Sequence, residues 1–185
     1  MRAFHFLKDD MRSGSGNEKP WKVGEERIYQ GNIVMCGKGY HSSPTVYDAL
    51  SYAPGNMLCV VAIPSVKQGT IKNTDKSVSP KRKLVTVLNV ENILREWACD
   101  CAERALKRAS VTDKRSWNAI QVARAYAKGE ATEAELAATR AAARDAARDA
   151  ARDATRAAAW NATDAEVNWQ KRRLSYLCNK AFRNS

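Results

Sequence analysis

The feature that most constrains this chain is a long alanine-rich segment near its end, from residue 132 to residue 182. Within it, the sequence Ala-Ala-Arg-Asp occurs three times in succession between Ala142 and Asp153. Alanine has the highest intrinsic helix propensity of the common residues. Each Asp lies three residues before the next Arg, a spacing that favours ion pairs along a helix. The segment is therefore expected to be helical even where nothing else touches it.

Two capping boxes mark starts of helices in this segment, one from Thr132 to Glu135 and one from Thr163 to Glu166. At 1.5 Å per residue, one uninterrupted helix would be roughly 75 Å long. The second box instead indicates a break near residues 161–163, after which the chain folds back as a hairpin. We favour the break because alanine faces cannot bury the large apolar side chains of the segment, which are Trp160, Val167, Leu174, Leu177 and Phe182.

The first part of the chain has the pattern of a small β domain. Short apolar runs bounded by turn residues predict strands over residues 3–7, 33–36, 57–63 and 83–88. Ser43 followed by Pro44 predicts the start of a short helix that runs to Tyr52 and is stopped by Pro54. Residues 1–89 are therefore expected to form one compact α/β domain.

Beyond residue 89 the apolar residues keep helical spacing. We expect two helices over residues 90–129 that pack on the first domain, the second capped by Thr112 and ended by Gly129. Residues 130–185 then form a long alanine-rich helical appendage. The fold class is α+β: a small, mostly β N-terminal domain with one short helix, followed by a C-terminal α-helical region.

The net charge of +11 raises the expectation of a polyanionic partner, such as nucleic acid or an acidic protein surface. The arginines of the repeat have Asp partners, so we interpret the repeat as a spacer. Cations without neighbouring acids are the better candidates for binding, and they are Lys38, Lys81, Arg82, Lys83, Lys171, Arg172, Arg173, Lys180 and Arg183.

The five cysteines are expected to be reduced, buried, small hydrophobic residues. Cys99 and Cys101 are two residues apart on a predicted helix, so their side chains diverge and are poorly placed to share a metal. No metal site is predicted. No stretch approaches the ~18 apolar residues of a membrane span, and the first residues lack the apolar run of a signal peptide, so no membrane partner is expected.

The densest group of functional-looking residues runs from Gly37 to Ser43 and contains His41, one of only two histidines. It lies at a predicted strand–turn–helix junction, where the first helical amides are suited to hold an anion beside Lys38. The P-loop pattern is absent. The alternative is that His41 is a packed or capping residue at a tight turn.

Residues 2 to about 63 resemble an uncharacterised domain family of bacteriophage and prophage proteins. The resemblance is carried by Arg2-Ala3-Phe4, by Gly24, Tyr29, Gly31 and Ile33 at approximate spacing, and by Cys36-x-x-Gly39-Tyr40-His41-Ser42. Members of that family often continue into alanine-rich repeats, as this chain does. The resemblance implies a mobile-element origin and no known activity.

The layout from Gly37 to Tyr52, followed by the apolar run at 57–63, is also similar to the NAD-binding stretch of ADP-ribosyltransferases. That resemblance implies NAD as cofactor, with tyrosines such as Tyr40 and Tyr52 stacking on nicotinamide. It implies His5, on the first strand, as a ribose-binding residue and Glu91 as the acidic residue, with His41 in the same site. The His-Gly-Thr motif of those enzymes is absent.

Three functions follow as hypotheses. The first is a phage-encoded accessory protein without cofactor that binds a host protein or nucleoprotein complex in the cytoplasm of the bacterial cell, for example as an anti-CRISPR-like inhibitor of a defence system. The second is an NAD-using, ADP-ribosyltransferase-like enzyme. The third is a structural, virion-associated protein. Self-association through the alanine faces is a further expectation, although a four-residue repeat drifts around the helix and forms no straight seam.

Overall fold

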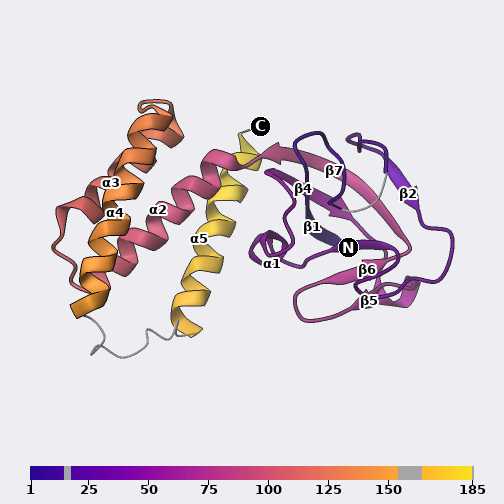
Figure 1. The fold of residues 1–185 in the computed structure, drawn as a ribbon. Coiled ribbons are helices and arrows are strands. Elements are labelled where there is room, and N and C mark those ends of the chain that lie inside the picture. Colours follow the sequence, from indigo (N-terminus) through magenta and orange to yellow (C-terminus); the bar gives the residue numbers. More distant parts are fainter. Residues whose placement is uncertain (15–17, 154–163, 185) are drawn as a thin grey trace. The chain divides into compact units, whose positions relative to one another are not determined.

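The computed structural model describes residues 1–14, 18–153 and 164–184, and side chains of the alanine-rich helix up to residue 143. The chain forms two compact units. The first comprises Met1–Glu91 and Leu174–Ser185, and the second comprises Asn92–Arg173. Strands fill most of the first unit and helices the second (Figure 1), which confirms the α+β class.

The first unit contains a four-stranded antiparallel sheet with the strand order β1-β4-β7-β2. Its strands are β1 (Arg2–Leu7), β4 (Met57–Ala62), β7 (Lys81–Asn89) and β2 (Glu26–Ile28). A register shift between Val60 and Val61 marks a β-bulge. The three longer strands confirm the apolar runs predicted from the sequence, because each run places large side chains on a sheet face that the fold buries.

A smaller antiparallel sheet has the order β3-β6-β5. It consists of β3 (Tyr40–Ser42), β6 (Ser77–Ser79) and β5 (Ile71–Lys72), with a short 3-10 helix η1 (Val66–Gln68) before β5. An isolated antiparallel bridge between Phe4 and Ser43 connects the two sheets. The backbone of these two residues exchanges both hydrogen bonds, each 2.8 Å long. This bridge brings the end of β3 to the edge strand β1.

The core of this unit follows from the two-residue period of the strands. Ala3 and Leu7 on β1 point to the same side of the sheet as Cys59 and Val61 on β4 and Leu84 on β7, and all five are buried. Trp21, from the loop before β2, closes this cluster. His5 lies between Ala3 and Leu7 on the same face, and Arg82 shares that face with Leu84, so the apolar core continues into polar groups.

Two local predictions in this unit are wrong. Residues 33–36 form a hairpin tip in place of a buried strand, with Val34 half exposed and Cys36 at a φ of +61°. The pairing that ends this tip is a single bridge between Val34 and Lys38. An apolar run of four residues between glycines is too short to specify a strand without a partner to pair with.

The short helix α1 (Val46–Leu50) starts later than predicted, because its N-cap is Thr45 and not Ser43. The Thr45 hydroxyl oxygen accepts a hydrogen bond of 3.1 Å from the amide of Asp48. Ser43 is instead part of the bridge to Phe4. The Thr45 side chain thus caps the first turn of α1.

The second unit is helical, with α2 (Glu91–Arg108), α3 (Lys114–Lys128), α4 (Glu133–Asp153) and the start of α5 (Asp164–Arg183). α3 and α4 pack side by side (Figure 1). α3 is capped by Asp113, one residue after the predicted Thr112, and ends at Gly129 in the left-handed conformation, as predicted. The capping box at Thr132 is confirmed by reciprocal bonds with Glu135.

The alanine-rich helix is confirmed up to Asp153. The predicted break near 161–163, and the start of the second capping box at Thr163, lie outside the described residues. The side chains of the repeated Arg and Asp residues from 144 onward are likewise outside the description. None of the helices in the part of the chain that the structure describes is both long and apolar enough to span a membrane.

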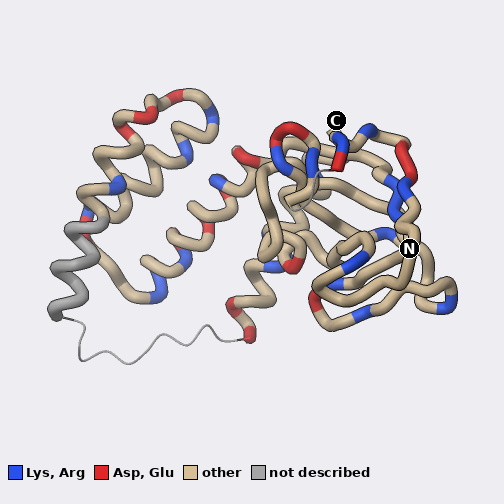
Figure 2. The backbone as a smooth tube through the Cα atoms, turned by 45° about the vertical axis from the view of Figure 1, so that its right-hand side comes forward, with Lys and Arg blue, Asp and Glu red and all other residues tan. Residues whose placement is uncertain are grey.

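A network of ion pairs holds the helices of the second unit together. Glu166 on α5 is buried, with 2% of its surface exposed, and accepts bonds of 2.7 Å from Arg104 and 2.8 Å from Arg108 on α2. Asp100, also on α2, accepts a 2.7 Å bond from Arg124 on α3 and another from Arg173 on α5. Figure 2 shows both acidic and basic positions on these helices.

Candidate functional site

The first unit contains a pocket of about 410 Å³. Pockets of this size are in the range that holds small molecules. Its walls come from β1, β3 and β7, from the hairpin before β3 and from the segment after α1. The lining residues are Phe4, His5, Phe6, Ser13, Gly14, Glu18, Cys36, Gly39, Tyr40, His41, Ser42, Ser43, Ala49, Tyr52, Pro54, Lys76 and Arg82.

Gly39 sets the path of the hairpin that forms one wall. Its φ of +108° is a conformation that L side chains rarely adopt. A Cβ atom at this position would lie 2.8 Å from a methyl group of Ile33 and 2.8 Å from one of Val78. The chain therefore turns tightly here, and the two residues that follow, Tyr40 and His41, enter β3 at the pocket.

A hydrogen bond inside the same hairpin orients His41. The backbone amide of Cys36 donates to its Nε2 atom over 3.0 Å. Nε2 is therefore the acceptor nitrogen of a neutral imidazole. Burial lowers the pKa of His41 from its ordinary value, and the positive charges of Arg82 and Lys76 add to this effect.

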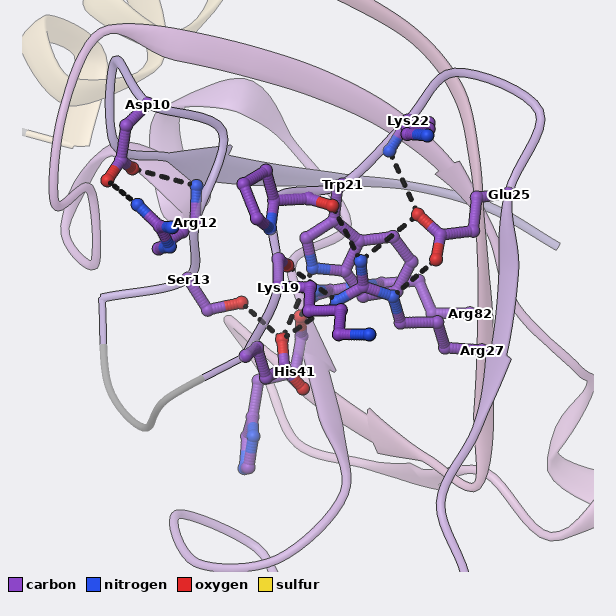
Figure 3. A network of polar contacts seen from close by, with 12 residues as sticks. Asp10, Arg12, Ser13, Lys19, Trp21, Lys22, Glu25, Arg27, His41 and Arg82 are labelled. Carbon is purple, nitrogen blue, oxygen red and sulfur yellow. Dashed lines mark hydrogen bonds and ion pairs between the residues drawn. The ribbon is translucent and has the colours of Figure 1, made fainter.

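Arg82 lines the pocket and is buried, with 3% of its surface exposed. Figure 3 shows it beside Trp21. Its guanidinium carbon is 4.5 Å from the ring centre of Trp21 and 5.2 Å from that of Tyr40. Nη1 donates to the backbone carbonyl of His41 over 2.8 Å. No carboxylate of the described residues forms an ion pair with it, and burial lowers its pKa to about 10.

Glu18 is the carboxylate among the lining residues that the structure describes. Its Oε2 atom accepts bonds from Ser13 Oγ at 2.9 Å and from Trp21 Nε1 at 3.2 Å, and Arg27 Nη1 is 3.7 Å away. Arg27 lies over the Trp21 ring at 4.1 Å and also pairs with Glu25. Figure 3 shows Arg27, Glu25 and Trp21 as one connected polar group. These contacts fix the carboxylate beside the pocket.

Two polar atoms in the pocket wall have no partner among the described residues, Nε2 of His5 and Oγ of Ser42. Ser42 is 3% exposed. Burial strongly lowers the pKa of His5, and the charges of Arg82 and His41 lower it further, so this imidazole is neutral near pH 7. Buried polar atoms without partners are uncommon in folded proteins, so these two are notable in the wall of a pocket.

The mouth of the pocket carries a second polar group around Tyr52, whose ring is half exposed. The Tyr52 hydroxyl donates to the carboxylate of Asp75 and accepts from Lys76 Nζ at 3.2 Å. Lys76 also lies 4.7 Å from the centre of the same ring. Hydrogen bonds with Tyr52 and with the thiol of Cys36 raise the pKa of Lys76, which is therefore charged at pH 7.

The structure brings together four of the five residues that the ADP-ribosyltransferase resemblance selects: His5, Tyr40, His41 and Tyr52 all line the pocket. Glu91 does not. It lies in the first turn of α2, where its amide bonds to Asn89 Oδ1. A carboxylate at the start of a helix is stabilised there by the helix dipole. The acidic residue among the described lining is Glu18.

The basic residues selected from the sequence do not form one surface. Arg82 is buried, whereas Lys81 and Lys83 point to the opposite face of β7, and Lys81 pairs with Glu26. Successive residues of a strand point to opposite faces of the sheet, so Arg82 faces away from Lys81 and Lys83. Leu84 lies two residues after Arg82 and is apolar, so the sequence could have predicted that both side chains face inward. Lys38 is exposed at the hairpin and is not part of the pocket lining.

The predicted basic end of the chain is also divided. Arg173 is bound by Asp100, with Glu96 3.7 Å away, so acids from α2 supply the partners that residues 171–183 lack. Arg172, Lys180 and Arg183 are exposed, and Lys171 is half buried. Sequence neighbours alone could not reveal the partners of Arg173, because they lie on another helix.

The cysteines differ from one another. All five are free thiols; Cys59, Cys99 and Cys178 are buried as expected, but Cys36 is exposed at the mouth of the pocket and Cys101 is half buried. Among the described residues, no group of three or more His, Cys, Asp and Glu side chains has the arrangement of a metal site.

Sequence comparison gives the domain a family. No curated protein and no solved structure matches the chain. A family model described as "Domain of unknown function (DUF7666)" matches residues 1–96, just over half of the 185 residues. The match covers every strand of the first unit and every described residue that lines the pocket. The chain therefore belongs to the DUF7666 family.

Proposed function

We propose that the pocket of this DUF7666 domain binds NAD and that the chain is an ADP-ribosyltransferase-like protein. The observation that carries the proposal is the convergence of His5, Tyr40, His41 and Tyr52 on one pocket. These residues come from β1, from β3 and from the segment after α1, which are far apart along the chain. The same four residues are those that the resemblance to an NAD-binding stretch implies for the ligand site.

The chemistry of the wall is suited to a dinucleotide. The Tyr52 ring at the mouth and the Tyr40 ring inside offer aromatic faces to a nicotinamide or adenine ring. The neutral His5 imidazole, whose Nε2 atom has no partner among the described residues, can bond to an oxygen of the ligand. Arg82 and Lys76 supply two positive charges for the two phosphate groups, against the single negative charge of Glu18.

A transfer reaction would need an acidic side chain beside the ribose, and we assign this role to Glu18 in place of Glu91. In the transfer, the bond between ribose C1 and the nicotinamide nitrogen breaks, nicotinamide leaves with the bonding electrons, and the acceptor nucleophile bonds to C1. The acceptor loses a proton, which a carboxylate can accept. Ser13 and Trp21 hold the Glu18 carboxylate in place for this step.

The test is a binding measurement with the full chain. NAD at millimolar concentration is expected to raise the melting temperature, because a ligand that binds only the folded state stabilises it. Tyr52→Ala is expected to weaken NAD binding at least tenfold by calorimetry. Tyr29→Ala removes a tyrosine from the same unit that does not line the pocket and should bind as the unaltered protein does. Absence of any NAD-dependent shift would overturn the proposal.

A second candidate follows from the exposed end of α5 and is the phage accessory hypothesis. Tyr176, Lys180 and Arg183 are all exposed, and their spacing of four and three residues places them on one face of the helix. A basic face with an aromatic ring is suited to an acidic host protein or to a nucleic acid.

This candidate predicts salt-sensitive binding. Lys180→Glu with Arg183→Glu should abolish binding of a labelled DNA duplex or of a purified host complex, measured by fluorescence anisotropy at two salt concentrations. Lys67→Glu with Lys72→Glu, a matched double reversal of exposed cations elsewhere in the first unit, should leave it intact. Binding that does not respond to the α5 reversal would exclude this face.

A further inference from the structure

The buried end of the pocket contains more hydrogen-bond donors than the protein itself uses. A guanidinium has five N–H donors. The guanidinium of Arg82 makes one hydrogen bond among the described residues, to the carbonyl of His41. Two more polar atoms in the same wall, Ser42 Oγ and His5 Nε2, have no partner there.

We propose that Arg82, Ser42 and His5 form a subsite for a phosphate group of the ligand, which makes the pocket specific for phosphorylated small molecules. The inference deepens the proposed function, because in NAD this group would be part of the pyrophosphate, but the subsite itself does not require NAD. A free phosphate ion and the phosphate of a nucleotide share the chemistry that it recognises.

The three side chains reach this place from three strands. Arg82 is on β7 and His5 on β1, both on the sheet face that carries the core, while Ser42 is on β3. The bridge between Phe4 and Ser43 holds the residues after His41 against β1. Their positions are thus set by backbone pairing and do not depend on a loop, which is a requirement for a preorganised site.

The contacts of Arg82 within the protein explain how its side chain is held, but they do not use all of its binding capacity. The rings of Trp21 and Tyr40 and the carbonyl of His41 hold the guanidinium in position. The negative charge of Glu18 favours the charged guanidinium but forms no ion pair with it, and burying a charge without such a pair is costly. Planar guanidinium groups bind phosphate oxygens in pairs, and serine hydroxyls and imidazoles bind the remaining oxygens.

The negative charge of Glu18 disfavours binding of an anion, but this carboxylate already has hydrogen-bond donors and a cation near it. Ser13 and Trp21 donate to it, and Arg27 is 3.7 Å from it. Arg82 and Lys76 give the described lining two positive charges against this one negative charge. The charges of the described lining therefore favour an anion, and the Oε2 atom of Glu18 is engaged by Ser13 and Trp21.

The experiment measures binding of inorganic phosphate and pyrophosphate to the full chain by calorimetry and by melting temperature, with sodium chloride at equal ionic strength as the reference. Both anions should raise the melting temperature above the chloride value. Ser42→Ala removes a buried hydroxyl that has no partner, so it should fold as well as the unaltered protein and yet bind pyrophosphate at least fivefold more weakly. Arg82→Lys should weaken binding at least tenfold.

Ser77→Ala is the matched control, because Ser77 is a buried serine that pairs with Ser42 in the neighbouring strand but does not line the pocket. It should bind pyrophosphate normally. The subsite is refuted if phosphate and pyrophosphate stabilise the chain no more than chloride, or if Ser42→Ala binds pyrophosphate as tightly as Ser77→Ala does. Should Arg82→Lys fail to fold, the Ser42→Ala comparison decides.

NAD and nicotinamide riboside, which lacks phosphate, separate this inference from the proposed function. Tight binding of pyrophosphate without binding of NAD would overturn the NAD proposal and support the subsite. Equal binding of NAD and nicotinamide riboside, both insensitive to Ser42→Ala, would support the NAD pocket and overturn the subsite. If NAD binds, nicotinamide riboside does not, and Ser42→Ala weakens the binding of NAD, the result supports both the NAD pocket and the phosphate subsite.

Discussion

The guanidinium of Arg82 donates to the backbone carbonyl of His41 across 2.8 Å, although the two residues are 41 positions apart in the sequence. This bond joins β7 of the larger sheet to β3 of the smaller one. The same guanidinium lies 5.2 Å from the ring centre of Tyr40 and lines the pocket. The bond therefore contributes both to the fold and to the site.

The two histidines provide a direct test of the electrostatics of the pocket. His5 and His41 are the only histidines in the chain, so NMR titration of the imidazole protons resolves both. Both are expected to titrate below the ordinary value of about 6.5, and His5 far below it, because burial and nearby cations disfavour the charged imidazole. An imidazole at position 5 that titrates at or above the ordinary value would contradict this environment.

The same shift predicts how stability depends on pH. The folded-state pKa of His5 is lower than that of the unfolded chain, so the unfolded chain binds its proton first as the pH falls. The stability contributed by the neutral His5 is complete above about pH 6.5 and is lost progressively below it. The free energy of unfolding, measured with urea at several pH values, should fall less steeply below pH 6.5 in His5→Gln than in the unaltered protein.

Gly39 is expected to tolerate no side chain. Gly39→Ala should lower the free energy of unfolding by about 2–4 kcal/mol, because it adds a clash with Ile33 and Val78 to the strain of a positive φ. Gly24→Ala is the matched control, since Gly24 has a φ of +87° with open space around it. It should cost only about 1 kcal/mol in urea unfolding followed by near-ultraviolet circular dichroism. If Gly39→Ala and Gly24→Ala lost equal free energy of unfolding, the clash of the new Cβ atom with Ile33 and Val78 would contribute nothing.

The helical unit depends on one buried carboxylate. Glu166→Gln should reduce the free energy of unfolding by about 2–3 kcal/mol, since it removes the charge that two guanidinium groups share. This is at the low end for buried ion pairs because Arg104 and Arg108 have about two fifths of their side chains exposed. Far-ultraviolet circular dichroism in urea measures the loss.

The exposed Glu135→Gln serves as the control for that variant and is expected to lose less stability, because glutamine can also complete a capping box. The pH dependence gives a second test. Arg104 lowers the pKa of Glu166, so its contribution is present above the pKa of an unfolded glutamate and is lost as the pH falls through the lower folded value. A Glu166→Gln variant as stable as Glu135→Gln would show that the buried pair contributes little.

Thiol chemistry should distinguish the five cysteines. Cys36 is exposed and should react with Ellman's reagent within seconds to minutes at pH 8. Burial raises the pKa of Cys59 and of Cys178 to about 12 and that of Cys101 to about 11, so these thiols carry little thiolate and should react slowly. Cys36→Ser should remove the fast phase. A fast phase that persists in this variant would mean that another cysteine is accessible.

Much of the fold was predictable because its determinants are local. The helical character of residues 133–153 follows from alanine propensity and the capping box at Thr132, and α3 ends at Gly129 because glycine adopts the left-handed conformation readily. The strands β1, β4 and β7 follow from apolar runs whose alternate residues face the core. Where the local signal was ambiguous, as at residues 33–36 and at the start of α1, the prediction was wrong.

The sequence by itself determined the secondary structure of the long segments and selected His5, Tyr40, His41 and Tyr52 as a group. Only the tertiary structure decided that Arg82 belongs with them and that Glu91 does not. The reason is physical: strand alternation turns Arg82 inward and its sequence neighbours outward, and the bridge from Phe4 to Ser43 and the bond from Arg82 to His41 join segments whose proximity no local pattern encodes.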